Sequence, residues 1–99
     1  MSPNLPPDPT SLAEIGARLA LTRRALGYTQ DTMARMMGST TAGSAFQNYE
    51  AGRRRISLDH ALKLCRTCQL TLPWIYQGQI DDLPAHLRDR IRQMEGEQN

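Results

Sequence analysis

Hydrophobic residues recur along most of this chain at intervals of three and four positions, in stretches separated by glycines, prolines and short polar runs. That spacing is typical of α-helices that bury one face and leave the other in water. No stretch predicts a β-strand. We therefore expect an all-α fold of six helices, which begin near residues 11, 29, 44, 57, 71 and 82.

Residues that favour helix ends mark the limits of the first two helices. Ser11 with Glu14 three positions later has the pattern of a capping box, in which each side chain satisfies a free N–H of the first turn. Gly27 then ends the first helix. Thr29 can cap the second helix with its hydroxyl, and Gly38 follows as a left-handed terminator.

The stretch from 30 to 49 is the part of the chain around which we expect the rest to be organised. Met33 and Met37 share one face of its first helix, and Phe46 and Tyr49 share one face of its second. The outer face of the second helix carries three side chains that can hydrogen-bond to base edges: Ser44, Gln47 and Asn48. Two short helices joined by a bend, with a polar outer face, form a helix-turn-helix.

A run of three arginines, Arg53-Arg54-Arg55, follows the second of these helices. Like charges in sequence repel one another, so the run is a good candidate for contact with phosphates. The alternative is a solvated basic loop that Glu50 partly neutralises. Between residues 10 and 66 there are nine basic and four acidic side chains, although the net charge of the whole chain is only +2. A basic body of this kind suits a polyanionic partner.

The fourth helix begins after Ser57, which can cap it. Its expected buried residues are Leu58, Ala61, Leu62, Leu64 and Cys65. Cys65 and Cys68 have the spacing of a metal or redox motif, but no second pair accompanies them and no strand precedes them. We interpret them as small core residues and predict no metal and no cofactor.

The last two helices each have a proline in the first turn, where its missing N–H is harmless. Gly78 ends the fifth helix, and an apolar stripe from Leu83 to Met94 marks the sixth. We divide the chain into a flexible N-terminal tail (1–10), a helix-turn-helix domain (11–78) and a C-terminal amphipathic helix and tail (79–99). The amphipathic helix either packs back on the domain or pairs with a second subunit.

Several classes of protein have no support in the sequence. No apolar run approaches the ~18 residues of a membrane span, and no signal peptide is recognisable. Two cysteines do not make a secreted disulfide scaffold, so we expect a cytoplasmic protein. The carboxylates of the core helices have no nucleophile near them in sequence, and we predict that the chain is not an enzyme.

Four motifs in order resemble the phage-repressor-like helix-turn-helix family, the λ-repressor/Cro-type and xenobiotic-response-element-type transcriptional regulators. They are Thr29-Gln30, Asn48-Tyr49-Glu50-Ala51-Gly52-Arg53, Ile56-Ser57-Leu58-Asp59 and Leu72-Pro73-Trp74-Ile75-Tyr76-Gln77-Gly78. The resemblance covers residues 12–78. It implies a compact five-helix λ-repressor-like domain, here with an additional C-terminal helix, that places its third helix in the major groove of double-stranded DNA.

The resemblance also implies roles for single residues. Base contacts would come from Ser44, Gln47 and Asn48. Phosphate contacts would come from Gln30, Thr41, Gly43, Arg53, Arg54 and Arg55. The segment before the third helix is longer than is usual in the family. The first turn of that helix lacks large polar side chains, so only its backbone N–H groups could bind a phosphate there.

The function expected from these features is sequence-specific DNA binding by a transcriptional regulator, with repression as the first expectation. Its partner would be double-stranded DNA. The chain would form a homodimer through the Trp74–Tyr76 region and the Leu83–Met94 helix. The alternative is a protein-interaction module that keeps the fold without reading bases and uses the same apolar residues to hold its partner. Salt dependence separates the two, because contacts to phosphates weaken steeply with ionic strength.

Overall fold

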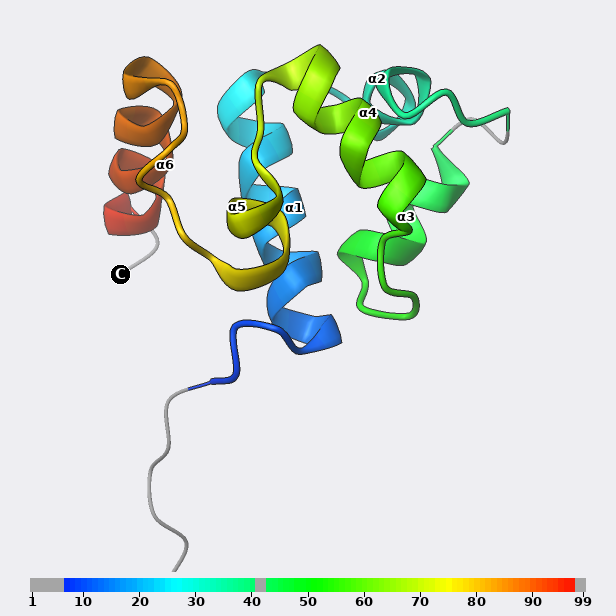
Figure 1. Ribbon diagram of the computed structural model, residues 1–99, viewed down its shortest axis with the longest axis horizontal. Helices are drawn as coiled ribbons and strands as arrows, with labels where there is room; N and C mark the ends of the chain where they lie inside the picture. The colour runs from blue at the N-terminus through cyan, green and yellow to red at the C-terminus, as the bar shows by residue number, and fades with distance from the viewer. Residues whose placement is uncertain (1–6, 41–42, 98–99) are drawn as a thin grey trace, which may run out of the picture.

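The computed structural model describes residues 7–40 and 43–97, and these residues fold into six helices (Figure 1). In chain order the helices are α1 (Leu12–Leu26), α2 (Gln30–Met36), α3 (Ser44–Glu50), α4 (Leu58–Cys68), α5 (Leu72–Gln77) and α6 (Ala85–Glu97). No strand occurs in the described part of the chain. The predicted all-α fold, a helix-turn-helix domain with one further helix at the C-terminal end, is confirmed.

The long helix α1 lies at the centre of the molecule. It packs against α3 on one side and against α5 and α6 on the other, while α2 packs against α3 and α4 (Figure 1). The helix-turn-helix and the C-terminal helix therefore lie on opposite sides of α1. This arrangement keeps α6 away from α3 (Figure 1).

The three predicted caps, Ser11, Thr29 and Ser57, are present in the structure, and Thr71 caps a fourth helix. The hydroxyls of Ser11, Thr29, Ser57 and Thr71 each accept a hydrogen bond from a backbone N–H in the first turn of the following helix, at 3.1–3.2 Å. Such caps satisfy N–H groups that have no partner inside the helix. α3 differs, because Gly43 precedes it in a right-handed conformation and offers no side-chain cap.

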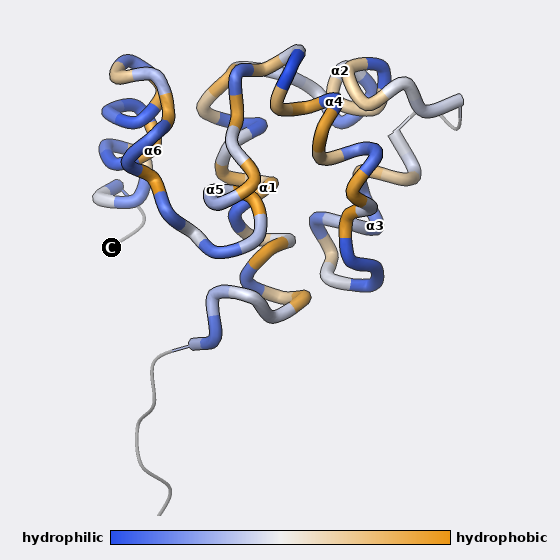
Figure 2. Tube along the Cα trace, in the orientation of Figure 1, coloured by the Kyte–Doolittle hydropathy of each residue, from blue (hydrophilic) through white to orange (hydrophobic). Residues whose placement is uncertain are grey.

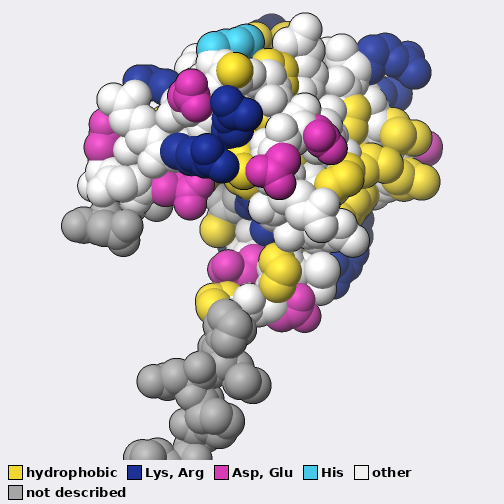
Figure 3. Space-filling model, turned by 60° about the vertical axis from the view of Figure 1, so that its left-hand side comes forward, with side chains coloured by type: hydrophobic (Ala, Val, Ile, Leu, Met, Phe, Trp, Pro, Cys, Tyr) yellow, Lys and Arg dark blue, Asp and Glu magenta, His cyan; other side chains and the backbone are white. Residues whose placement is uncertain are grey.

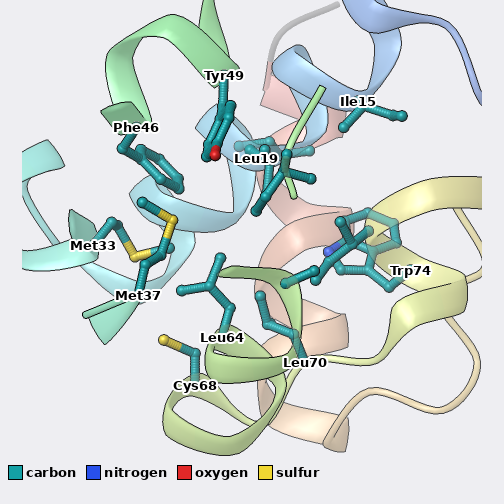
Figure 4. Close-up of a cluster of buried hydrophobic side chains, with 14 of the residues drawn as sticks. Ile15, Leu19, Met33, Met37, Phe46, Tyr49, Leu64, Cys68, Leu70 and Trp74 are labelled. Atoms are coloured by element: carbon teal, nitrogen blue, oxygen red, sulfur yellow. The ribbon is translucent and has the colours of Figure 1, made fainter. Parts of the chain in front are cut away.

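The core is built where apolar faces from all six described helices meet (Figures 2 and 4). Phe46 and Met33 are completely buried between α2 and α3, and Leu19 of α1 and Leu64 of α4 are buried beside them. The predicted inward faces of α2 and α3 are therefore correct.

The predicted buried face of α4 is partly wrong. Leu58 and Leu62 are 56% and 44% exposed, whereas Ala61 and Leu64 are completely buried and Cys68 nearly so. Successive residues of an α-helix are rotated by about 100°, so the stripe through positions 61, 64 and 68 turns Leu58 and Leu62 away from the core. Apolar character alone did not distinguish the inward leucine from the two outward ones.

The surfaces expected to hold a second subunit are used inside the chain. Leu83, Leu87 and Ile91 are buried where α6 packs against α1. Trp74 and Ile75 are also buried, and the indole N–H of Trp74 donates to the Thr22 hydroxyl at 3.0 Å. Most side chains of the predicted dimer contact thus have partners in the same chain, and a homodimer through this region stays a prediction.

The expected tail falls partly outside the described residues, since 1–6 are not described. Two arginines of the domain hold the segment just before α1. Arg18 donates to the carbonyl oxygen of Pro9 at 2.6 Å, and Arg55 donates to that of Thr10 at 2.6 Å. The N-terminal segment thus contacts the domain at residues 9 and 10, and the predicted boundary at 11 stays a prediction.

Truncation of the central aromatic residue tests this core. We expect Phe46→Ala to lower the free energy of unfolding by about 3–5 kcal/mol, because it removes a completely buried ring and leaves a cavity. Leu12→Ala, at a residue that is 37% exposed, is the control and should cost much less. Urea denaturation followed by circular dichroism measures both, and equal losses would contradict the assigned inward face of α3.

Candidate nucleic-acid interface

The outer face of α3 carries the polar side chains that the sequence predicted. Phe46 and Tyr49 point into the core, while Ser44 and Gln47 are exposed and Asn48 is half-buried. Positions 44, 47 and 48 are spaced by three and four residues, so their side chains share one face of the helix. A short helix with a buried apolar side and an exposed amide-bearing side can lie in a groove of DNA without exposing its core.

One carboxylate connects the three helices that form this face. Glu50, the last residue of α3, accepts hydrogen bonds from Nε of Arg23 in α1 at 2.7 Å and from the side-chain amide of Gln30 in α2 at 2.9 Å. The same Arg23 also donates to the carbonyl oxygen of Tyr28 between α1 and α2 at 3.2 Å. With side-chain exposures of 20% for Arg23 and 11% for Glu50, this ion pair is only weakly screened by solvent.

Within the described part of the chain, Glu50 does not pair with the arginine loop, which the alternative of a partly neutralised, solvated loop had assumed. Its two oxygens face Arg23 and Gln30, so the charges of the loop lack this counter-charge. No local sequence pattern indicated the pairing, because its partners are 27 and 20 positions away. Gln30, expected at a phosphate, has its amide engaged by Glu50 at the start of α2.

A glycine in α1 lets α3 approach closely. A β-carbon on Gly16 would lie 2.5 Å from the carbonyl oxygen of Tyr49 and 2.6 Å from that of Glu50. Such distances are far inside van der Waals contact, so a larger residue would push the end of α3 away from α1. Gly16 and the Arg23–Glu50 pair therefore fix the same end of α3, one through shape and the other through charge.

The three arginines of the loop divide between two places. Arg53 donates to the side-chain oxygen of Asn48 at 3.3 Å, and Arg54 lines a shallow hollow together with Asn48 and Ser44. Arg55 instead donates to the carbonyl oxygen of Thr10 at the start of α1. The structure thus brings the first two arginines together with the predicted base-reading residues and separates the third from them.

A residue of α4 also lines the hollow beside α3. The volume of the hollow is about 460 Å³, and His60 of α4 lines it opposite Ser44 and Arg54. The Nδ1 atom of His60 lies 2.8 Å from the hydroxyl of Tyr49, and the two rings meet edge to face at 5.8 Å. His60 therefore supports the underside of α3 as well as facing the hollow.

The start of α3 has an acidic neighbour. A β-carbon on Gly43 would lie 2.6 Å from a carboxylate oxygen of Asp31, so this acid stands beside the first residues of the helix. A negative charge there disfavours a phosphate at the Gly43 N–H. Thr41, the other predicted contact in this turn, lies outside the described residues. On α4, the amine of Lys63 lies close to Gly38, so a basic group that was not predicted flanks the turn.

The cysteine pair shows no arrangement for a metal. Cys68 is buried, Cys65 is half-buried, and both are free thiols. Burial raises the pKa of both thiols, which keeps them protonated and unreactive. Across residues 7–40 and 43–97, no group of three or more His, Cys, Asp or Glu side chains could hold a metal ion.

The sequence profile of the helix-turn-helix family HTH_3, which comprises regulators of the xenobiotic-response-element and Cro type, matches residues 19–75. The match covers more than half of the chain and runs from the middle of α1 through α5, so the chain belongs to this family. Its helix-turn-helix domain is a DNA-binding domain, and proteins of the family are typically not enzymes.

No curated protein and no solved structure matches the chain significantly. Of the helices that the structure describes, none has both the length and the apolar character needed to cross a membrane.

Removal of the connecting carboxylate tests the support of α3. We expect Glu50→Ala to lower the free energy of unfolding by about 1.5–3 kcal/mol, because it removes charge-assisted hydrogen bonds and leaves Arg23 without its partner. Glu97→Ala at the exposed end of α6 should change it by less than about 0.5 kcal/mol. Urea denaturation checks both values, and a Glu50→Ala protein as stable as the parent would remove this interaction from the account.

Proposed function

We propose that this protein is a sequence-specific transcriptional regulator that binds double-stranded DNA with α3 in the major groove and acts as a repressor. The observation that carries the proposal is the shared position of Ser44, Asn48, Arg53 and Arg54 on one surface. Hydrogen-bonding side chains for base edges and guanidinium groups for phosphates are the two kinds of contact that specific DNA binding needs.

Gln47 and Asn48 are the residues to which we assign base recognition. The N–H₂ of a side-chain amide can donate to N7 of adenine while the amide oxygen accepts from the N6 amino group, since adenine presents one acceptor and one donor in the major groove. Gln47 is exposed and Asn48 is oriented by its hydrogen bond from Arg53. Ser44 lies one turn earlier on the same face and would reach a neighbouring base or phosphate.

Arg53 and Arg54 are the residues to which we assign the DNA backbone. Both are exposed at the end of α3 that is furthest from Asp31, and Arg54 borders the hollow beside the helix. Among the other predicted phosphate contacts, Gln30 would bind a phosphate while its amide stays hydrogen-bonded to Glu50. Arg55 would reach a phosphate only after its hydrogen bond to the Thr10 carbonyl breaks. We therefore expect Arg55 to contribute less than Arg54.

Repression is the simplest regulatory outcome for such a surface, because occupation of a site is enough to exclude other proteins from it. Such a regulator would act in the compartment that holds the DNA. The interaction-module alternative required Trp74, Ile75 and the stripe of α6 as a free apolar surface, and most of that surface is buried within the chain. DNA recognition is the better supported of the two functions.

Selection of preferred sequences from a random duplex library tests the proposal directly. We expect a short consensus and, at that site, a loss of about 1–3 kcal/mol in binding free energy for Gln47→Ala or Asn48→Ala. The same variants should bind unselected DNA almost as the parent does. Failure to enrich any sequence, or equal losses on both DNAs, would contradict base reading by α3.

Comparison of two adjacent arginines tests the backbone contact. Arg54→Ala should weaken binding to every duplex and should lower the slope of log affinity against log salt by about one. Arg55→Ala is the matched control, because it removes the same charge from a side chain held by Thr10, and its slope should change less. Fluorescence anisotropy across a range of salt concentrations gives both slopes. Identical slopes for the two variants would contradict the assignment of Arg54, and not Arg55, to the DNA backbone.

A further inference from the structure

The largest exposed apolar side chains of α4 have no role in the core or in the DNA-binding surface. Leu58 and Leu62 are 56% and 44% exposed and lie one turn apart on the same side of the helix. Half-buried Cys65 continues their stripe towards the C-terminal end of α4. Figure 3 shows one face of the molecule, on which hydrophobic side chains lie among acidic and basic ones.

The charges beside this stripe have an arrangement that fits the same surface on a second molecule. Asp59 precedes Leu62 by three positions and Arg66 follows it by four, so both lie on one flank of the stripe. The rise of an α-helix places them about 4.5 Å and 6 Å from Leu62 along the axis, in opposite directions. Both side chains are exposed, and within the described part of the chain neither has an ion-pair partner.

An antiparallel pair of α4 helices brings these opposite charges together twice. In a two-fold contact the same surface of both copies takes part, so residue i of one copy contacts residue j of the other, and j contacts i. Such a surface must therefore be complementary to itself. With the axis beside Leu62, Asp59 of each copy lies opposite Arg66 of the other. The two Leu62 side chains meet at the axis, and each Leu58 faces the Cys65 position of the other copy. Parallel packing would instead place Asp59 against Asp59 and Arg66 against Arg66.

We propose that the Leu58–Leu62 face of α4, flanked by Asp59 and Arg66, is a self-association surface on which a second copy of this chain docks in antiparallel orientation. This surface is an alternative to the residues of α5 and α6 that the sequence indicated. Two exposed leucines per copy make a small contact, so the dimer is weak in the absence of DNA. The association itself does not depend on DNA binding; only its use on a two-fold-related site rests on the proposed function.

Sedimentation equilibrium of the full chain without DNA measures the association. Over about 10–300 µM protein at ~50 mM salt, the apparent mass should rise from 11.1 kDa towards twice that value. Leu62→Glu should weaken dimerisation at least about tenfold, since it places a charge in the apolar centre. Leu12→Glu, which adds the same charge at an exposed leucine of α1, is the matched control and should leave the dissociation constant unchanged.

A charge exchange tests the antiparallel register. Asp59→Arg alone places like charges opposite one another and should weaken the dimer about tenfold, whereas Asp59→Arg combined with Arg66→Asp should restore it. Circular dichroism confirms that each variant is folded. A mass of 11.1 kDa throughout, or a dimer that Leu62→Glu does not affect, would overturn the proposed surface. A double variant no stronger than Asp59→Arg would overturn the register.

The DNA-binding variants keep the two proposals separate. Gln47→Ala lies outside the α4 surface, so it should lose specific DNA binding and still form the dimer. Leu62→Glu should keep the monomer's weak affinity for unselected DNA. A dimer without DNA binding would therefore contradict the proposed function alone, and DNA binding by a strict monomer would contradict the self-association alone.

Discussion

The Glu50 carboxylate holds the helix-turn-helix together, because it accepts from Arg23 in α1 and from Gln30 in α2 while it ends α3. Helices of seven residues such as α2 and α3 are too short to be stable alone and depend on tertiary contacts. α3 also lacks a side-chain cap at its start, so its position is set mainly from its C-terminal end. Gly16 completes that support by letting the backbone of α1 approach the last carbonyls of α3.

With that end fixed, the surface presented by α3 follows. Phe46 and Tyr49 occupy the core, so the amides of Gln47 and Asn48 face outward. The loop that follows turns Arg53 and Arg54 towards Asn48 and sends Arg55 back to the N-terminal segment. The hydrogen bond between Tyr49 and His60 links this surface to α4, whose other side carries the exposed leucines. One short helix thus connects the core, the face proposed to bind DNA and the helix proposed for self-association.

The features that could be predicted from the sequence were those set by local chemistry. Ser11, Thr29 and Ser57 begin helices because a hydroxyl one residue before a helix satisfies its first N–H groups, and this requires no knowledge of the rest of the fold. The inward faces of α2 and α3 followed from the spacing of Met33, Met37, Phe46 and Tyr49 in the same way. The family resemblance added the order of the helices and the DNA-binding role.

What the sequence did not reveal depends on contacts between distant segments. No residue near Glu50 in sequence indicated that its carboxylate would form an ion pair with Arg23. Likewise, no residue near Leu62 distinguished this exposed leucine from the buried Leu64. The stripe of α6 and the residues around Trp74 looked available for a partner until α1 was seen to cover them. The choice between an intramolecular and an intermolecular use of an apolar face is made by the tertiary fold, which a periodic pattern does not contain.

The proposed function requires the α3 surface to bind DNA through phosphates as well as bases. The most direct test is fluorescence anisotropy of the full chain with a random-sequence duplex at about 50 and 200 mM salt. Two phosphates neutralised by Arg53 and Arg54 predict an affinity at least about tenfold lower at the higher concentration. Binding that is insensitive to salt, or no binding at either concentration, would contradict the account.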